Sequence, residues 1–185
     1  MGDLLVVPIG EVENHWLQAA AACAEEMLHM PAQLLNHLPV PLSALHAQRN
    51  QYLSTTLLEF LLPVGRERGA RVLGVTELDL FIPILTFMFG QAQLGGRLAL
   101  VSLARIRPEF YRFPPDPALT LERLRKEIRH ELGHTLGLVH CGDTRCAMSL
   151  SNSIVQVDAK NDSLCASCLA RSRDHLRALQ SGGNS

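Results

Sequence analysis

Residues 130–140 read His130-Glu131-Leu132-Gly133-His134-Thr135-Leu136-Gly137-Leu138-Val139-His140, an H-E-x-x-H-x-x-G-x-x-H string. An α-helix advances about 100° per residue, so the first two histidines lie one turn apart on the same face. The third histidine cannot join them on a continuing helix, because six further residues would carry it about 9 Å along the axis. Gly137 can adopt the left-handed conformation that ends a helix and turns the chain back. The spacing therefore predicts three imidazoles around one metal ion.

The chemistry of this string favours zinc-dependent hydrolysis. Three neutral imidazole nitrogens suit Zn²⁺ and leave a coordination position open for water, although they accept other divalent ions too. We expect Glu131 to lean toward that water, because His130, His134 and His140 already supply three protein ligands. In this hypothesis zinc acidifies the bound water and polarises the scissile carbonyl, while Glu131 takes the proton and passes it to the departing amine. The string thus predicts a peptidase.

A second set of metal-binding residues begins directly after the third histidine. Cys141 and Cys146 form C-x4-C, and Cys165 and Cys168 form C-x2-C. Two close pairs separated by a loop match a closed four-thiolate zinc site that serves structure. Disulfides are the alternative, but the N-terminus shows no basic segment followed by an apolar core, so export to an oxidising compartment is unsupported. We therefore expect two Zn²⁺ ions, one catalytic and one structural, in a cytoplasmic protein.

These motifs together resemble those of the archaemetzincins, a branch of the metzincin metallopeptidases. The resemblance covers the extended histidine string, the cysteine that follows it, C-x4-C-x-Met and the later C-x2-C. It implies that Met148 is the Met-turn residue beneath the histidines. It also implies that Gly90, Gln91 and Ala92 lie in a sheet-edge strand that pairs with extended substrate, and the alternative is that they belong to an interior strand.

The resemblance implies a metzincin-like fold, and the order of predicted elements agrees with it. We expect an α/β (α+β) fold with a twisted mixed sheet, an active-site helix and a small zinc-bound C-terminal lobe. A chain of 185 residues with 47% hydrophobic residues fits one domain, residues 1–185, with an active-site cleft between lobes 1–137 and 138–185. A net charge of −1 provides no large basic field, and no run of eighteen apolar residues occurs. We expect a peptide or protein substrate, no nucleic-acid or membrane partner, and a monomer.

Periodicity and turn residues predict the elements along the chain. The first expected elements are a strand at Leu4–Ile9, a helix from about Asn14 to His29, a short strand within Pro31–Pro41, a helix at Tyr52–Leu62 that stops at Pro63 and Gly65, and a strand at Val72–Leu80. Two strands, Phe87–Leu94 and Arg97–Ala104, should be joined by a two-residue turn at Gly95-Gly96. Asp116 should cap the active-site helix, Pro117 should begin it, and the helix should run to Gly137. A last helix should extend from beyond Cys168 to about Leu179.

Two other functions compete with a peptidase. The four-thiolate cluster can support a fold regardless of catalysis, so a zinc-stabilised module that binds peptides or regulates a partner with little catalysis is the main alternative. Hydrolysis of a non-peptide amide would use the same zinc and carboxylate. Within the peptidase hypothesis, the sequence does not decide between an aminopeptidase and an endopeptidase, but an intracellular peptidase without a pro-segment would be safer with restricted access, which favours short or N-terminal substrates. Glu77 or Asp79 near a strand end could bind a substrate ammonium, although solvated carboxylates are the simpler interpretation.

Overall fold

The central sheet grows around the apolar strand near the N-terminus. In the computed structural model, which describes residues 3–181, β1 (Leu4–Ile9) lies between β2 (Ala32–Leu34) and β5 (Arg71–Thr76), both parallel to it. Next to β5 lies the parallel strand β9 (Leu98–Ser102), and β8 (Gly90–Ala92) forms the far edge, antiparallel to β9. The predicted strand at residues 4–9 and the predicted mixed α/β sheet are confirmed.

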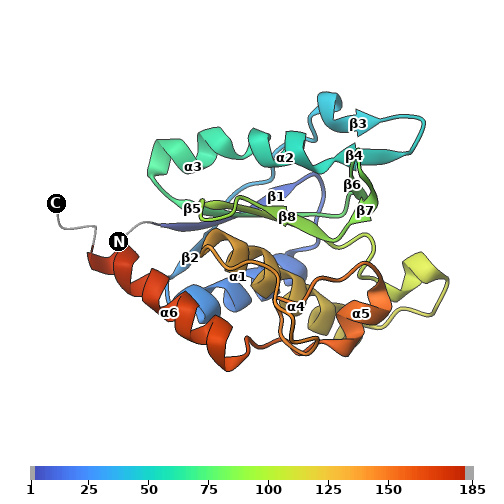
Figure 1. The fold of residues 1–185 in the computed structure, drawn as a ribbon. Coiled ribbons are helices and arrows are strands. Elements are labelled where there is room, and N and C mark those ends of the chain that lie inside the picture. The colour runs from blue at the N-terminus through green and yellow to red at the C-terminus, as the bar shows by residue number, and fades with distance from the viewer. Residues whose placement is uncertain (1–2, 182–185) are drawn as a thin grey trace.

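Helices cover both faces of this sheet, as Figure 1 shows. The helices α1 (Asn14–Leu28) and α4 (Pro117–Thr135) pack on one face, and α2 (Ser54–Phe60) and α3 (Leu62–Arg68) lie over the other. Successive side chains of a strand point to opposite faces, so the strands of this sheet must be apolar on both. The alternate residues of β1 accordingly enter two separate hydrophobic cores.

The predicted helix at Tyr52–Leu62 was wrong at both ends. The chain forms the short strand β4 (Gln51–Leu53) before α2 begins, and α3 then carries the helical path past Pro63. Proline in the first turn of a helix loses no hydrogen bond, because the N–H at that position has no partner within the helix. Pro63 therefore fits in the first turn of α3, and Gly69, whose φ of 59° is left-handed, caps the end of the helix.

Two of the predicted strands are each divided into two shorter strands, which belong to different sheets. The segment Val72–Leu80 contributes to β5 and to β6 (Leu80–Ile82), and Phe87–Leu94 contributes to β7 (Leu85–Met88) and to β8. A second sheet has the order β3-β4-β6-β7, in which β3 is Leu45–His46. Alternation of apolar residues shows that a segment is extended, but it does not reveal where the chain leaves one sheet for another.

The connection between β8 and β9 contradicts the predicted two-residue turn. The two strands pair as expected, but residues 93–97 separate them, and the Gly96 N–H donates to the carbonyl of Gln93 at 3.0 Å. The Gly95 N–H instead donates to the carbonyl of His134 at 2.8 Å. A contact with the end of α4 therefore shapes this loop, and no local turn signal could have indicated it.

The helix α4 begins as the sequence predicts. The Asp116 carboxylate accepts a hydrogen bond from the Leu119 N–H at 2.9 Å, and Pro117 occupies the first turn. Leu124, Ile128 and Leu132 are fully buried against the sheet. This apolar face holds the helix in place. The predicted ligands lie on a different face of α4, which points away from this core.

The chain after α4 packs beneath the sheet and helices. It contains α5 (Ile154–Ala159) and α6 (Ala166–Ser181), and α6 starts before Cys168 rather than after it. Two short 3₁₀ helices, η1 (Leu42–Ala44) and η2 (Pro108–Tyr111), lie in the connections. Among the described residues, no helix combines the length and apolarity that crossing a membrane requires.

Candidate active site

The end of α4 makes the chain turn back toward its own helix. The Gly137 N–H donates to the carbonyl of His134 at 2.9 Å, and the Leu138 N–H donates to the carbonyl of Gly133 at 3.0 Å. This pair of bonds, with a left-handed glycine of φ 74°, forms a Schellman motif. The helix stops at Thr135, two residues before the predicted end, and Gly137 turns the chain as expected.

The turn brings His140 beside the two helical histidines. The ring centroids lie 4.7–5.2 Å apart, and the candidate ligand nitrogens all lie within 4.8 Å of one another. The Nδ1 atom of His130 donates to the carbonyl of Ala147 at 2.9 Å, and Nδ1 of His134 donates to that of Leu138 at 2.8 Å. Both rings therefore carry their proton on Nδ1 and direct the Nε2 lone pair toward the shared space.

The spacing of these nitrogens suits a metal ion. The Nε2 atoms of His130 and His134 lie 3.1 Å apart, and two lone pairs at that distance repel each other unless a cation lies between them. Burial lowers the pKa of His130 to about 3 and also lowers the pKa of His134 and His140. The imidazoles are thus neutral near pH 7, which is the protonation state that binds zinc.

Glu131 lies in the same cleft as the three histidines. Its residue surface is only 5% exposed, and burial raises the pKa of its carboxyl well above the usual value. The neighbouring carboxyl of Glu127 raises this pKa further, whereas the ammonium of Lys160 lowers it. A carboxyl with a raised pKa holds a transferred proton more readily, which is the property that a general base near neutral pH needs.

The cleft has a volume of about 350 Å³ and runs along the edge of the central sheet. One wall is the segment from Leu85 to Ala92, and the other carries Leu150, Ser151 and Asn152. The strand β8 is the last strand of its sheet, so Gly90, Gln91 and Ala92 form an edge strand and not an interior one. An extended peptide can pair with such an edge.

The four cysteines of the two predicted pairs form a second cluster. Their sulfur atoms lie within 4.8 Å of one another, and the Cys165 N–H donates to the sulfur of Cys146 at 3.2 Å. Contacts with the Ser167 hydroxyl and the Cys168 N–H lower the pKa of Cys165 to about 6, which favours the metal-binding thiolate. All five cysteines are free thiols, and the fifth, Cys23, is buried in the main core.

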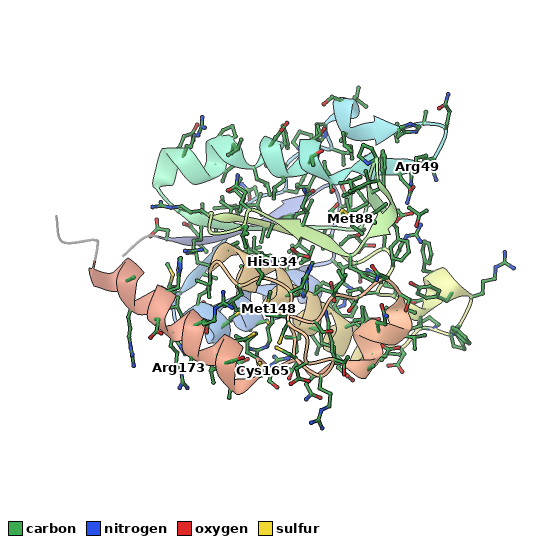
Figure 2. All side chains as sticks on the ribbon, viewed as in Figure 1. Arg49, Met88, His134, Met148, Cys165 and Arg173 are labelled. Carbon is green, nitrogen blue, oxygen red and sulfur yellow. The ribbon has the colours of Figure 1, made fainter. Side chains whose placement is uncertain are left out.

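Met148 joins the two clusters. Figure 2 shows His134, Met148 and Cys165 in that order from the sheet downward. The side chain of Met148 is fully buried, and a Cβ on Gly133 would overlap its sulfur, so the methionine packs directly beneath α4. The carbonyl of Met148 accepts a hydrogen bond from the Cys141 N–H at 2.9 Å. A distortion of either cluster would therefore be transmitted to the other through this segment.

Two charged residues of the cleft wall, Glu127 and Lys160, were not among the predicted site residues. Their side chains are 4% and 1% exposed, and Lys160 Nζ lies 2.9 Å from Glu127 Oε1. Glu127 precedes Glu131 by four residues, so helical periodicity could have placed it on the same face. Lys160 directly follows α5, and no local signal connects it to the histidines.

The two carboxylates that the sequence offered for a substrate ammonium lie elsewhere. Asp79 pairs with Arg105 at 2.6 Å, Glu77 pairs with Arg107 at 2.5 Å, and neither acidic residue is among those that line the cleft. Both carboxylates therefore already have a cationic partner within the protein.

Breaking the buried pair from one side should destabilise the protein strongly. We expect Lys160→Met to lower the free energy of unfolding by about 3–5 kcal/mol, because Glu127 would remain buried without a partner. The double change Lys160→Met with Glu127→Leu should recover most of this loss, since apolar residues of similar size can replace a buried ion pair. Urea denaturation of the zinc-loaded proteins measures both values. A single variant as stable as the parent would contradict the expectation.

Comparisons with known proteins agree with this geometry. Residues 11–173 match the family model described as peptidase family M54. The chain is 41% identical to the archaemetzincin of Methanocaldococcus jannaschii, over 92% of this chain and 93% of that protein. Its fold is similar to the crystal structure of archaemetzincin from Methanopyrus kandleri, with a TM-score of 0.82, 36% identity, and coverage of 95% and 96% of the two chains. A zinc-dependent peptidase from Methanocorpusculum labreanum is similar with a TM-score of 0.81, 25% identity, and coverage of 91% and 99%.

Proposed function

Because this chain belongs to peptidase family M54, the archaemetzincins, we propose that it cuts peptide bonds in its three-histidine cleft with Glu131 as the general base. Membership in the family makes the chain a zinc metallopeptidase that acts on peptides or proteins. The observation that carries the proposal is the convergence of two Nδ1-protonated histidines, with their Nε2 atoms 3.1 Å apart, beside a buried carboxyl.

In this proposal the three histidines and the four cysteines hold two zinc ions. His130, His134 and His140 would hold the catalytic ion, which supplies a Lewis acid that polarises the scissile carbonyl and makes the attacking water more acidic. The structural ion would be held by Cys141, Cys146, Cys165 and Cys168. The neutral histidines and the clustered thiols are the donor types that zinc prefers.

The residues around the histidines would carry the remaining steps. The main chain of β8 would pair with the extended substrate and hold it along the cleft. Glu131 would take a proton from the attacking water and deliver it to the departing amine. Its buried position supports the first of these steps, since the raised pKa of the carboxyl makes the proton easier to accept and to hold until the amine departs.

We also propose a domain organisation, a cellular location and an oligomeric state for the protein. We propose that residues 1–137 and 138–185 form the two lobes of one domain, because the cleft has walls from both. The thiol cluster supports a location in the cytoplasm, where cysteines are kept reduced. We also propose a monomer that binds neither nucleic acid nor membrane, and a net charge of −1 provides no large basic field for these last two partners.

The contacts favour cleavage within peptides over removal of the first residue. An aminopeptidase needs a carboxylate for the substrate ammonium, and both carboxylates suggested by the sequence are paired with arginines. In the cleft itself, Glu131 is the proposed base and Glu127 pairs with Lys160. An extended edge strand, by contrast, suits a substrate that continues on both sides of the cut bond.

A mixed peptide library, analysed by mass spectrometry, tests the proposal. We expect the zinc-loaded protein to produce internal cuts, equally in N-acetylated and free peptides, and we expect a chelator to abolish them. Loss of single N-terminal residues from free peptides alone would identify an aminopeptidase instead. Peptide binding without cleavage at any zinc loading would favour the binding-module alternative and reject the catalytic proposal.

A further inference from the structure

The edge strand β8 passes unusually close to the proposed base. A Cβ built on Gly90 would lie 2.7 Å from both Cγ and Oε1 of Glu131, and 2.6 Å from the carbonyl oxygen of Leu100. Side-chain carbons do not approach other heavy atoms this closely in folded proteins. Gly90 is not among the glycines with a positive φ, so its backbone conformation does not demand glycine. A glycine is therefore required at position 90 because no room exists for a side chain, and not because of the backbone conformation.

The elements on either side of this contact cannot easily move apart. Gly90 is held in the sheet by its antiparallel pairing opposite Val101 of β9. Glu131 projects from α4, whose other face is fixed in the core by the fully buried Ile128 and Leu132. The side chain of Glu131 can move more easily than the strand or the helix, because its torsion angles can rotate without disrupting the sheet or the core. A methyl group at position 90 would thus displace the Glu131 carboxyl first.

We propose that Gly90 is a positioning residue for Glu131, because its missing side chain leaves the space in which the carboxyl faces the three histidines. The inference rests on the proposed role of Glu131 as the base and gives that role a second structural requirement. Gly90 and Glu131 both line the cleft with the three histidines, so a shift of the carboxyl changes its reach toward the reacting atoms. A misplacement of about 1 Å can lower a reaction rate about a hundredfold.

The contact with Leu100 must be separated from the contact with Glu131. Gly90→Ala would meet the Leu100 carbonyl in any background, and this clash would loosen β8 whatever Glu131 does. In a Glu131→Ala background the added methyl group still meets Leu100, but the carboxyl that it would displace is gone. A double-mutant cycle between the two positions therefore isolates the part of the effect that acts through Glu131.

Acetohydroxamate binding to the zinc-loaded protein provides a readout that needs no substrate. Its two oxygens chelate a metal ion, and it can donate a hydrogen bond to a neighbouring carboxylate. We expect Gly90→Ala to weaken binding by about tenfold or more with Glu131 present, and by less than about twofold with Glu131→Ala. Titration calorimetry measures all four proteins of the cycle. Gly142→Ala is a control for adding a methyl group to a glycine, because a Cβ there meets no atom within 4 Å.

A second readout separates positioning from a general loss of structure. On a peptide that the parent cleaves, Gly90→Ala should lower kcat by about tenfold to a hundredfold, with zinc content nearly unchanged and a rise in KM that is smaller than the fall in kcat. If Gly90→Ala folds only in the Glu131→Ala background, the clash is with Glu131 and the proposal is supported. If the parent cleaves no peptide, the proposed function fails, yet the acetohydroxamate cycle still decides the role of Gly90.

Three results would overturn the inference. Equal weakening of acetohydroxamate in both backgrounds would mean that Gly90 serves only the strand. Unchanged binding in both backgrounds would mean that the carboxyl is not displaced. Loss of zinc from Gly90→Ala, or failure to fold in both backgrounds, would assign the glycine to structure.

Discussion

Replacing Glu131 with glutamine should lower peptide turnover by about 10²–10⁴-fold and leave zinc binding unchanged. Glutamine has nearly the same shape as glutamate but cannot accept the proton of the attacking water. The three histidines that would hold zinc are untouched, so the zinc content should not change. The edge strand β8 that would pair with the substrate is also unchanged, so KM should change little. Steady-state kinetics on a peptide found in the library, together with zinc content from elemental analysis, measures the two quantities.

The same variant should keep or gain stability, which distinguishes a catalytic role from a structural one. Burial and the Glu127 carboxyl raise the pKa of Glu131, so its charged form is unfavourable in this position. A neutral amide removes that unfavourable charge, and the free energy of unfolding should not fall. A substitution that lowers activity but keeps or raises stability is typical of a catalytic residue.

Glu59→Gln is the matched control, because Glu59 is exposed on α2, on the opposite face of the sheet. This variant should retain turnover within about twofold, as expected for a surface change away from the cleft. Turnover of Glu131→Gln equal to that of the parent would refute the role of Glu131 as the base.

Replacing Cys168 with alanine should remove the structural zinc and disorder the segment that carries the third histidine. Structural zinc sites contribute about 10–16 kcal/mol of apparent binding free energy in small domains. Cys168 is buried with Cys146 and Met148, so the loss should propagate to the backbone that contacts His130. We expect the melting temperature to fall by about 10–20 °C, corresponding to a loss of about 5 kcal/mol.

Calorimetry and zinc analysis together test this second prediction. The zinc content should fall from two ions per chain to fewer than one, because the Cys141 N–H and the Met148 carbonyl link the two clusters. Cys23→Ala is the control, since Cys23 is a buried core thiol whose pKa burial raises to about 11. That variant should keep both ions. A Cys168→Ala protein with two zinc ions and the parent melting temperature would contradict the assignment.

Several features could be predicted because they depend on neighbours along the chain. The Asp116 cap, the proline that begins α4 and the Gly137 turn each follow from hydrogen bonds within a few residues. Local signals also had limits. Pro63 was predicted to end a helix but lies in the first turn of one, because proline is compatible with a first turn and the sequence does not show on which side of it the helix lies.

The sequence by itself determined the candidate histidine ligands, the two close cysteine pairs and the reversal that brings His140 toward His130, since short spacings specify one face of a helix and one turn. Only the tertiary structure decided what surrounds them. Gly90 lies against Glu131, and Lys160 against Glu127, across separations of more than thirty residues. Such contacts arise from the packing of whole elements around a shared core, and no periodicity along the chain encodes which distant residue will fill a given space.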